Sequence, residues 1–161
     1  MEELSLADTP LTVKSVEYLS RIMESNHTNL IKLNLSNCNM KHQHMKALLK
    51  YILKSSTLTS LDISGNKITD SAVDSLFEII VGDASPLLPF VQPPLNYLDL
   101  TSCGLKSDGC LKVFKALSTR NTRRMEYFNI SSNMIGSNES IYKEISQCSI
   151  ANLKLNICDL G

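Results

Sequence analysis

The sequence predicts an α/β solenoid, a curved row of about six stacked units with a parallel β-sheet on the concave face and α-helices on the convex face. Two observations support this fold class. First, the hydrophobic spacing L-x-x-L-x-L-x-x-N/C-x-L occurs six times. Its copies start at residues 1, 30, 58, 95, 125 and 150, so successive starts are 29, 28, 37, 30 and 25 residues apart. Second, an apolar stripe with helical spacing follows most copies.

The six copies are strongest in the middle of the chain. The third copy reads Leu58, Leu61, Ile63, Asn66 and Ile68, and the fourth keeps the same offsets with a cysteine in place of asparagine. Around each central leucine, apolar and polar residues alternate with a period of two, which is typical of a strand that buries one face. Each copy therefore predicts a short strand followed by a turn.

The segments between the copies predict amphipathic helices. After the third copy, the apolar residues Val73, Leu76, Phe77 and Ile80 follow the i, i+3, i+4, i+7 spacing of a helix that buries one side. Candidate N-capping residues precede or open four of the segments, at Thr12, Thr69, Ser107 and Asn138. The expected helices span 13–24, 42–54, 70–81, 108–118 and 139–147.

A single strand or helix of this kind cannot bury its own apolar face, so the units must stack into one continuous core. We therefore expect one domain over residues 1–161. The spacing starts at Met1 and ends near Gly161 without a polar capping segment, which favours a piece of a longer repeat protein. The alternative is self-association, edge to edge, through uncapped ends.

The long interval between the third and fourth copies indicates an insertion at 82–94. Four of the five prolines lie in it, and proline blocks helix continuation. Its apolar residues favour a loop folded back on the solenoid edge, and the alternative is a protruding contact element.

Composition excludes several classes of function. The 16 basic and 16 acidic residues balance, so a nucleic-acid partner is not expected. No apolar run approaches the roughly 18 residues of a membrane-spanning helix, and the acidic start Met1-Glu2-Glu3 is unlike a signal peptide. Five cysteines without paired spacing indicate reduced thiols, so we expect an intracellular protein, cytoplasmic or nuclear.

The sequence contains no recognisable catalytic, cofactor or metal site. It lacks the G-x-S-x-G and glycine-rich phosphate patterns. Cys38, His42 and His44 are close in sequence, but helical residues at i and i+2 diverge by about 200°. Cys38 also shares its repeat position with Asn66, which predicts hydrogen bonding within the turn rather than metal binding. We therefore expect no enzyme activity of its own.

Period, helix length and phrases such as Leu61-Asp62-Ile63-Ser64-Gly65-Asn66 resemble the ribonuclease-inhibitor type of leucine-rich repeat. That group includes ribonuclease inhibitor, the Ran GTPase-activating protein, tropomodulin-like actin regulators and the sensor domains of NOD-like receptors. The resemblance covers nearly the whole chain and implies the solenoid fold. It does not point to one function, because this fold serves many.

The residues on either side of each central leucine should face the concave side of the sheet. Tyr97 and Tyr127 occupy the same repeat position on neighbouring strands, so their rings should lie side by side. Exposed tyrosines on a rigid sheet are common interface anchors, and the alternative is cross-strand packing without a partner. The candidate partner-binding residues are Lys32, Asn34, Asp62, Tyr97, Asp99, Glu126, Tyr127 and Asn129.

The leading interpretation is a non-catalytic interaction module, a scaffold or recognition surface, that binds a protein or peptide on this face. Two alternatives stay open. One is a regulator of another enzyme, either GTPase-activator-like or inhibitor-like, and the other is an actin-associated structural module.

Overall fold

The computed structural model describes residues 1–24, 29–81, 94–119 and 125–155. Strands and helices alternate along these residues, as the repeated spacing predicts. The strands are β1 (Glu3–Ser5), β2 (Lys32–Asn34), β3 (Ser60–Asp62), β4 (Tyr97–Asp99), β5 (Met125–Asn129) and β6 (Ile150–Lys154). The helices are α1 (Val13–Glu24), α2 (His42–Lys54), α3 (Val73–Val81), α4 (Ser107–Thr119) and α5 (Glu139–Gln147), with a 3₁₀ turn, η1 (Asp70–Ala72), before α3.

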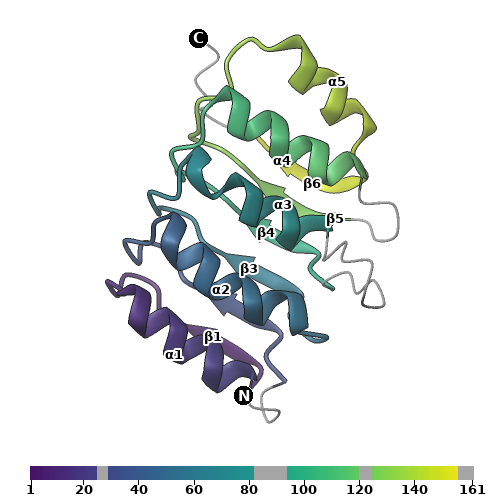
Figure 1. Cartoon of the computed structure of the whole chain (residues 1–161). Helices are drawn as coiled ribbons and strands as arrows, with labels where there is room; N and C mark the ends of the chain where they lie inside the picture. Colours follow the sequence, from purple (N-terminus) through teal and green to yellow (C-terminus); the bar gives the residue numbers. More distant parts are fainter. Residues whose placement is uncertain (25–28, 82–93, 120–124, 156–161) are drawn as a thin grey trace.

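The strands form one parallel sheet in the order of the sequence, from β1 to β6. Its register pairs equivalent repeat positions, since Leu33 lies opposite Leu61, and Leu61 opposite Leu98. The helices cover one side of the sheet, and the described elements leave its other side open (Figure 1). The predicted α/β solenoid is thereby confirmed.

A single hydrophobic core runs along the stack between sheet and helices. Leu33, Leu61 and Leu98 are at most 1% exposed, so the central leucines of β2, β3 and β4 point into this core. Towards the C-terminal end the rings of Phe114 and Phe128 pack edge to face, 5.8 Å apart. Burial of these repeated positions stabilises the stack by about 25 cal/mol per Å² of apolar surface removed from water.

The largest difference from the expected helices lies at 70–81. Residues Asp70–Ala72 form a 3₁₀ turn, and the α-helix begins only at Val73. The expected cap at Thr69 is absent, because Thr69 has a φ of 58° and its side chain makes no capping hydrogen bond. Thr12 and Asn138 do cap, since their side-chain oxygens accept the backbone N–H groups of Ser15 and Ser140.

Residues 82–93 of the expected insertion lie outside the described residues, so its course and the single domain over 1–161 stay predictions. No described helix has the length and apolar character needed to cross a membrane.

Candidate functional site

The concave face of the sheet carries a stacked pair of tyrosines. Tyr97 of β4 lies opposite Tyr127 of β5 in the parallel register. Their ring centroids are 4.3 Å apart and their planes differ by only 5°. Both side chains are half-buried. The two rings thus form one flat, partly exposed aromatic surface that spans two strands.

The residue after each central leucine contributes to turn structure as well as to the surface. The side chains of Asn34, Asp62, Asp99 and Asn129 each accept the backbone N–H two residues further on, at 2.9–3.1 Å. These bonds terminate each strand in the manner of an Asx turn. Sequence reasoning assigned these four residues to partner binding and missed their role in the turn. The repeated pattern of Asn or Asp two residues before Ser or Thr was the available signal.

Asp99 and Asn129 also join neighbouring strands. The Asn129 Nδ2 amide donates to Asp99 Oδ2 at 3.1 Å and to the Tyr127 hydroxyl at 3.2 Å. Asp99 is only 8% exposed, so its carboxylate belongs more to this network than to the open surface. These bonds hold β4, β5 and the tyrosine pair in a fixed arrangement.

The electrostatics around Tyr97 are acidic. Burial, the neighbouring Tyr127, and the carboxylates of Asp99 and Asp62 together raise the pKa of Tyr97 to about 12. Each of these effects disfavours the phenolate. Lys32 of β2 forms an ion pair with Glu3 of β1, so its charge is already balanced on the same face. The site therefore has a mildly negative character next to an aromatic surface.

A hollow of about 650 Å³ opens on the concave face across β1 to β4. Its lining comprises Glu3, Leu4, Ser5, Lys32, Leu33, Asn34, Ser60, Asp62 and Tyr97. Four of the eight predicted residues line it, namely Lys32, Asn34, Asp62 and Tyr97. Of the others, Tyr127 stacks on Tyr97 and Asn129 bonds to Tyr127. Glu126 is exposed on β5 and does not line the hollow.

The cysteines and asparagines of the turn positions bond to the backbone. Asn66 Oδ1 accepts the N–H groups of Cys38 and Met40, while the Cys38 thiol donates to the Leu6 carbonyl at 3.0 Å. Burial raises the pKa of the Cys103 thiol to about 12, which keeps it protonated at neutral pH. Among the described residues, no group of three His, Cys, Asp or Glu side chains is placed to hold a metal ion.

His44 lies in the first turn of α2, and its ring contributes to contacts between repeats. It is 7% exposed and connects two repeats. Its Nδ1 accepts the Lys41 backbone N–H at 3.0 Å, so its Nε2 is the donor to the Leu11 carbonyl at 3.1 Å. Both ring nitrogens are engaged, which gives His44 a role in stacking the first two units.

A comparison with known protein families identifies the repeat. The model of the Leucine Rich repeat family matches residues 54–77 and 91–114, which contain the third and fourth copies of the strand spacing. The chain is a leucine-rich repeat protein. Within the repeat, the matched segments contain β3 with the start of α3, and β4 with the start of α4.

Curated relatives are much longer than this leucine-rich repeat chain. Human NACHT, LRR and PYD domains-containing protein 5 is 28% identical over 165 residues, which cover 99% of this chain and 13% of that protein. The mouse NACHT, LRR and PYD domains-containing protein 14 is 27% identical, with 96% and 15% covered. Mouse leucine-rich repeat-containing protein 75B is 30% identical, with 63% and 33% covered. The chain thus spans about one seventh of the length of the first two.

Two solved structures share the fold. The leiomodin-1 actin-binding site 2 superimposes with a TM-score of 0.68 at 16% identity, covering 91% of this chain and 77% of that one. The tropomodulin C-terminal domain of Caenorhabditis elegans gives 0.67 at 15% identity, with 90% and 83% covered. At these identities the likeness concerns the fold alone.

Proposed function

We propose that this leucine-rich repeat chain is a non-catalytic interaction module that binds a protein or peptide on its concave face. The hollow across β1 to β4, bounded by Tyr97 and Asp62, is the observation that supports this proposal most directly. Its polar and aromatic lining is open to a partner, and the leucine-rich repeat family supports a protein-binding function.

Rigid support favours this surface as a recognition site. The Asx-type bonds of Asp62 and Asp99 hold the strand ends, and the stack with Tyr127 restrains the Tyr97 ring. A side chain that is already ordered loses little conformational entropy on binding. Aromatic residues held in this way are frequent energetic centres of protein interfaces.

The test is to purify partners of the full-length protein by affinity capture, identify them by mass spectrometry, and measure binding to the chain by calorimetry. We expect Tyr97→Ala to weaken binding at least about tenfold, in the range of an interface hot spot. Tyr142→Ala on α5 is a matched control, because Tyr142 is 49% exposed and lies on the helical side. Unchanged affinity in a folded Tyr97→Ala variant would reject the concave site.

An actin-associated role is the second candidate. It is supported by the likeness in fold to the actin-binding site 2 of leiomodin-1. Co-sedimentation of the chain with actin filaments tests it directly. We expect the pellet to retain the chain above the level of a bovine serum albumin control if this role applies, and recovery only in the supernatant would exclude it.

A further inference from the structure

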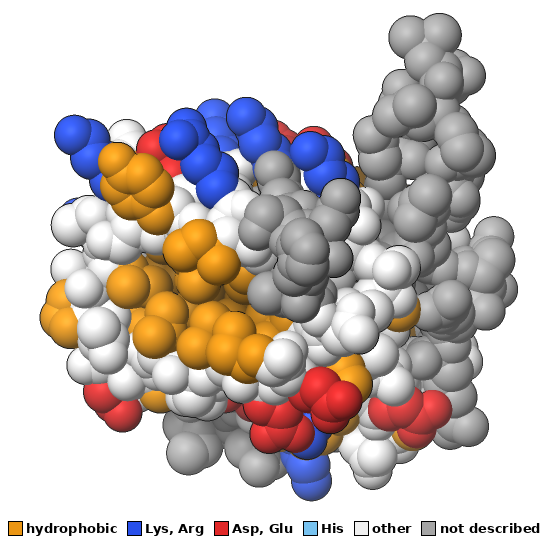
Figure 2. All heavy atoms as spheres, turned by 90° about the horizontal axis from the view of Figure 1, so that it is seen from below, with side chains coloured by type: hydrophobic (Ala, Val, Ile, Leu, Met, Phe, Trp, Pro, Cys, Tyr) orange, Lys and Arg blue, Asp and Glu red, His pale blue; other side chains and the backbone are white. Residues whose placement is uncertain are grey.

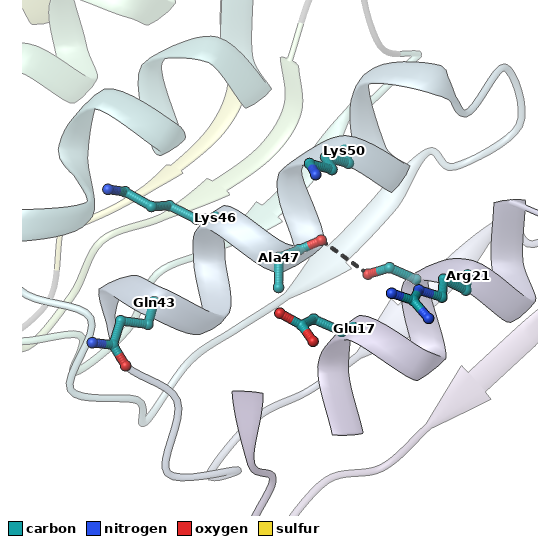
Figure 3. Close-up of a pocket in the computed structure, with 7 residues that line it drawn as sticks. Glu17, Arg21, Gln43, Lys46, Ala47 and Lys50 are labelled. Atoms are coloured by element: carbon teal, nitrogen blue, oxygen red, sulfur yellow. Dashed lines mark hydrogen bonds between the residues drawn. The ribbon is translucent and has the colours of Figure 1, made fainter. Parts of the chain in front are cut away.

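A groove lies between α1 and α2 on the helical side of the molecule, away from the concave face. Seven residues line it, and Figure 3 shows them on the two facing helices: Glu17, Ser20 and Arg21 on α1, and Gln43, Lys46, Ala47 and Lys50 on α2. Its volume is about 390 Å³.

The groove exists because its floor is small and its walls are long. Ser20 is 5% exposed, and its hydroxyl donates to the Ala47 carbonyl at 3.1 Å, which fixes the two helices close together. Side chains on both sides of this contact are exposed and several bonds longer. Gln43, Lys46 and Lys50 follow one face of α2 at i, i+3 and i+7, so they form one wall about 10 Å long.

The groove is positively charged in a chain whose net charge is zero. Three cationic side chains line it against the single carboxylate of Glu17. None of Arg21, Lys46 and Lys50 forms an ion pair with a described residue, and Arg21 instead lies 6.0 Å from the Tyr18 ring centroid. In Figure 2, Lys and Arg side chains gather along one edge of the molecule, and most Asp and Glu side chains lie along the opposite edge.

We propose that the α1–α2 groove is a second docking site, which binds an acidic segment of a polypeptide partner. Carboxylates of the segment would pair with Lys46, Lys50 and Arg21, and its backbone or apolar side chains would contact Ala47 on the floor. The wall length matches about two turns of a helix that carries acidic residues at i and i+4.

The lining favours a carboxylate-bearing segment over phosphate-rich partners. Lys46 and Lys50 are spaced at i and i+4 on α2 and Arg21 lies on the facing helix, so the cations are spread along the groove and suit several separate carboxylates better than one compact phosphate. A nucleic acid would need a longer basic track, with aromatic residues for stacking in the case of a single strand. A flat membrane surface would contact the lysine tips and leave the floor untouched.

Fluorescence anisotropy tests this proposal with the whole chain. The probe is a fluorescein-labelled peptide of about 12 residues, built from Glu-Ala-Ala-Ala repeats, and a peptide with Gln in place of Glu is its neutral counterpart. We expect saturable binding of the acidic peptide that weakens with added salt. Lys46→Gln with Lys50→Gln should weaken it about fivefold or more, since two charge pairs are lost.

Lys115→Gln with Lys143→Gln is the matched control, because it removes the same charge from exposed positions on α4 and α5. We expect this control and Tyr97→Ala to retain the affinity within about twofold, which separates the groove from the concave site. The proposal would be overturned by an equal loss of affinity in the control variant or by equal binding of the neutral peptide. It would also be overturned if a single-stranded oligonucleotide or phosphatidylserine vesicles bound more tightly than the acidic peptide in a way that depends on Lys46 and Lys50.

Discussion

Asn66 shows how much one side chain contributes to this repeat architecture. Its Oδ1 accepts two backbone N–H groups of the preceding repeat, from Cys38 and Met40. Its Nδ2 donates to the carbonyls of Leu35, Ile63 and Ser64. The residue is fully buried, so water cannot replace these bonds. Asn133 makes the equivalent bonds to the backbone of the fourth repeat, two repeats further along the stack.

Replacing Asn66 with alanine leaves buried backbone groups of two repeats without partners. We expect Asn66→Ala to lower the free energy of unfolding by about 3 kcal/mol. Urea denaturation followed by circular dichroism measures the change. Asn152→Ala is the control, because Asn152 is exposed and donates a single bond to the Glu126 carbonyl. A loss no greater than that of the control would contradict the structural role of Asn66.

Tyr97 should be distinguishable by its titration. Its pKa is raised from 10.0 to about 12, so the protonated form is favoured in the folded state. The stability linked to this group is therefore present below pH 10 and is lost as the pH rises from 10 through 12. We expect Tyr97→Phe to remove this part of the loss of folding stability at alkaline pH.

The contribution of Asp62 to this shift can be tested separately. We expect Asp62→Asn to lower the pKa of Tyr97, measured by phenolate absorbance with Tyr97→Phe as the reference. An unchanged titration curve would refute the role of the Asp62 carboxylate.

Adjacent helices approach closely where α4 begins. A Cβ atom added at Gly109 would lie 2.2 Å from Asp70 Oδ1. That same oxygen accepts the Lys106 backbone N–H at 2.8 Å, just before α4. Glycine at this place therefore allows η1 to support the start of the next helix.

A double-mutant cycle tests this junction. Alanine normally stabilises a helix relative to glycine by up to about 1 kcal/mol. With Asp70 present, we expect Gly109→Ala to give no such stabilisation, because the new methyl group displaces the Asp70 carboxylate from the Lys106 backbone N–H. In an Asp70→Ala background, Gly109→Ala should stabilise the helix as usual. The change in the free energy of unfolding caused by Gly109→Ala should therefore differ by about 1 kcal/mol between the two backgrounds, as measured by thermal unfolding. Equal effects in both backgrounds would show that the two residues are not coupled.

At the scale of the whole molecule, the end formed by β1 and α1 is apolar. Leu4, Leu6, Leu11 and Leu19 are only partly buried there, and Ile22 is 61% exposed. Hydrophobic side chains fill the centre of this end when the stack is viewed along its length (Figure 2). β1 is also an edge strand of the sheet. An apolar end beside an edge strand is prone to association.

For this chain in isolation we therefore expect self-association at raised concentration. Light scattering at several concentrations should show a mass that increases with concentration. Ile22→Lys should reduce this increase by placing a charge on the apolar end, whereas Met134→Lys should not, because Met134 is exposed in the turn after β5. A constant monomer mass across the series would contradict the expectation.

The sequence alone determined the fold and the limits of most elements, because strand and helix periodicities repeat at the same offsets in each unit. Central leucines such as Leu61 have one compatible environment in a stacked array, and the structure shows them buried. The stacked position of Tyr97 and Tyr127 likewise followed from their equivalent places in adjacent repeats.

Only the tertiary structure decided what depends on distances between repeats. The bridging ring of His44 and the 3₁₀ start at Asp70 involve contacts with a neighbouring repeat, which periodicity does not encode. The same holds for the α1–α2 groove, because in the sequence Lys46 and Arg21 are exposed positions of two separate helices and nothing indicates that they are close. Their proximity arises when Ser20 and Ala47 bring those helices together.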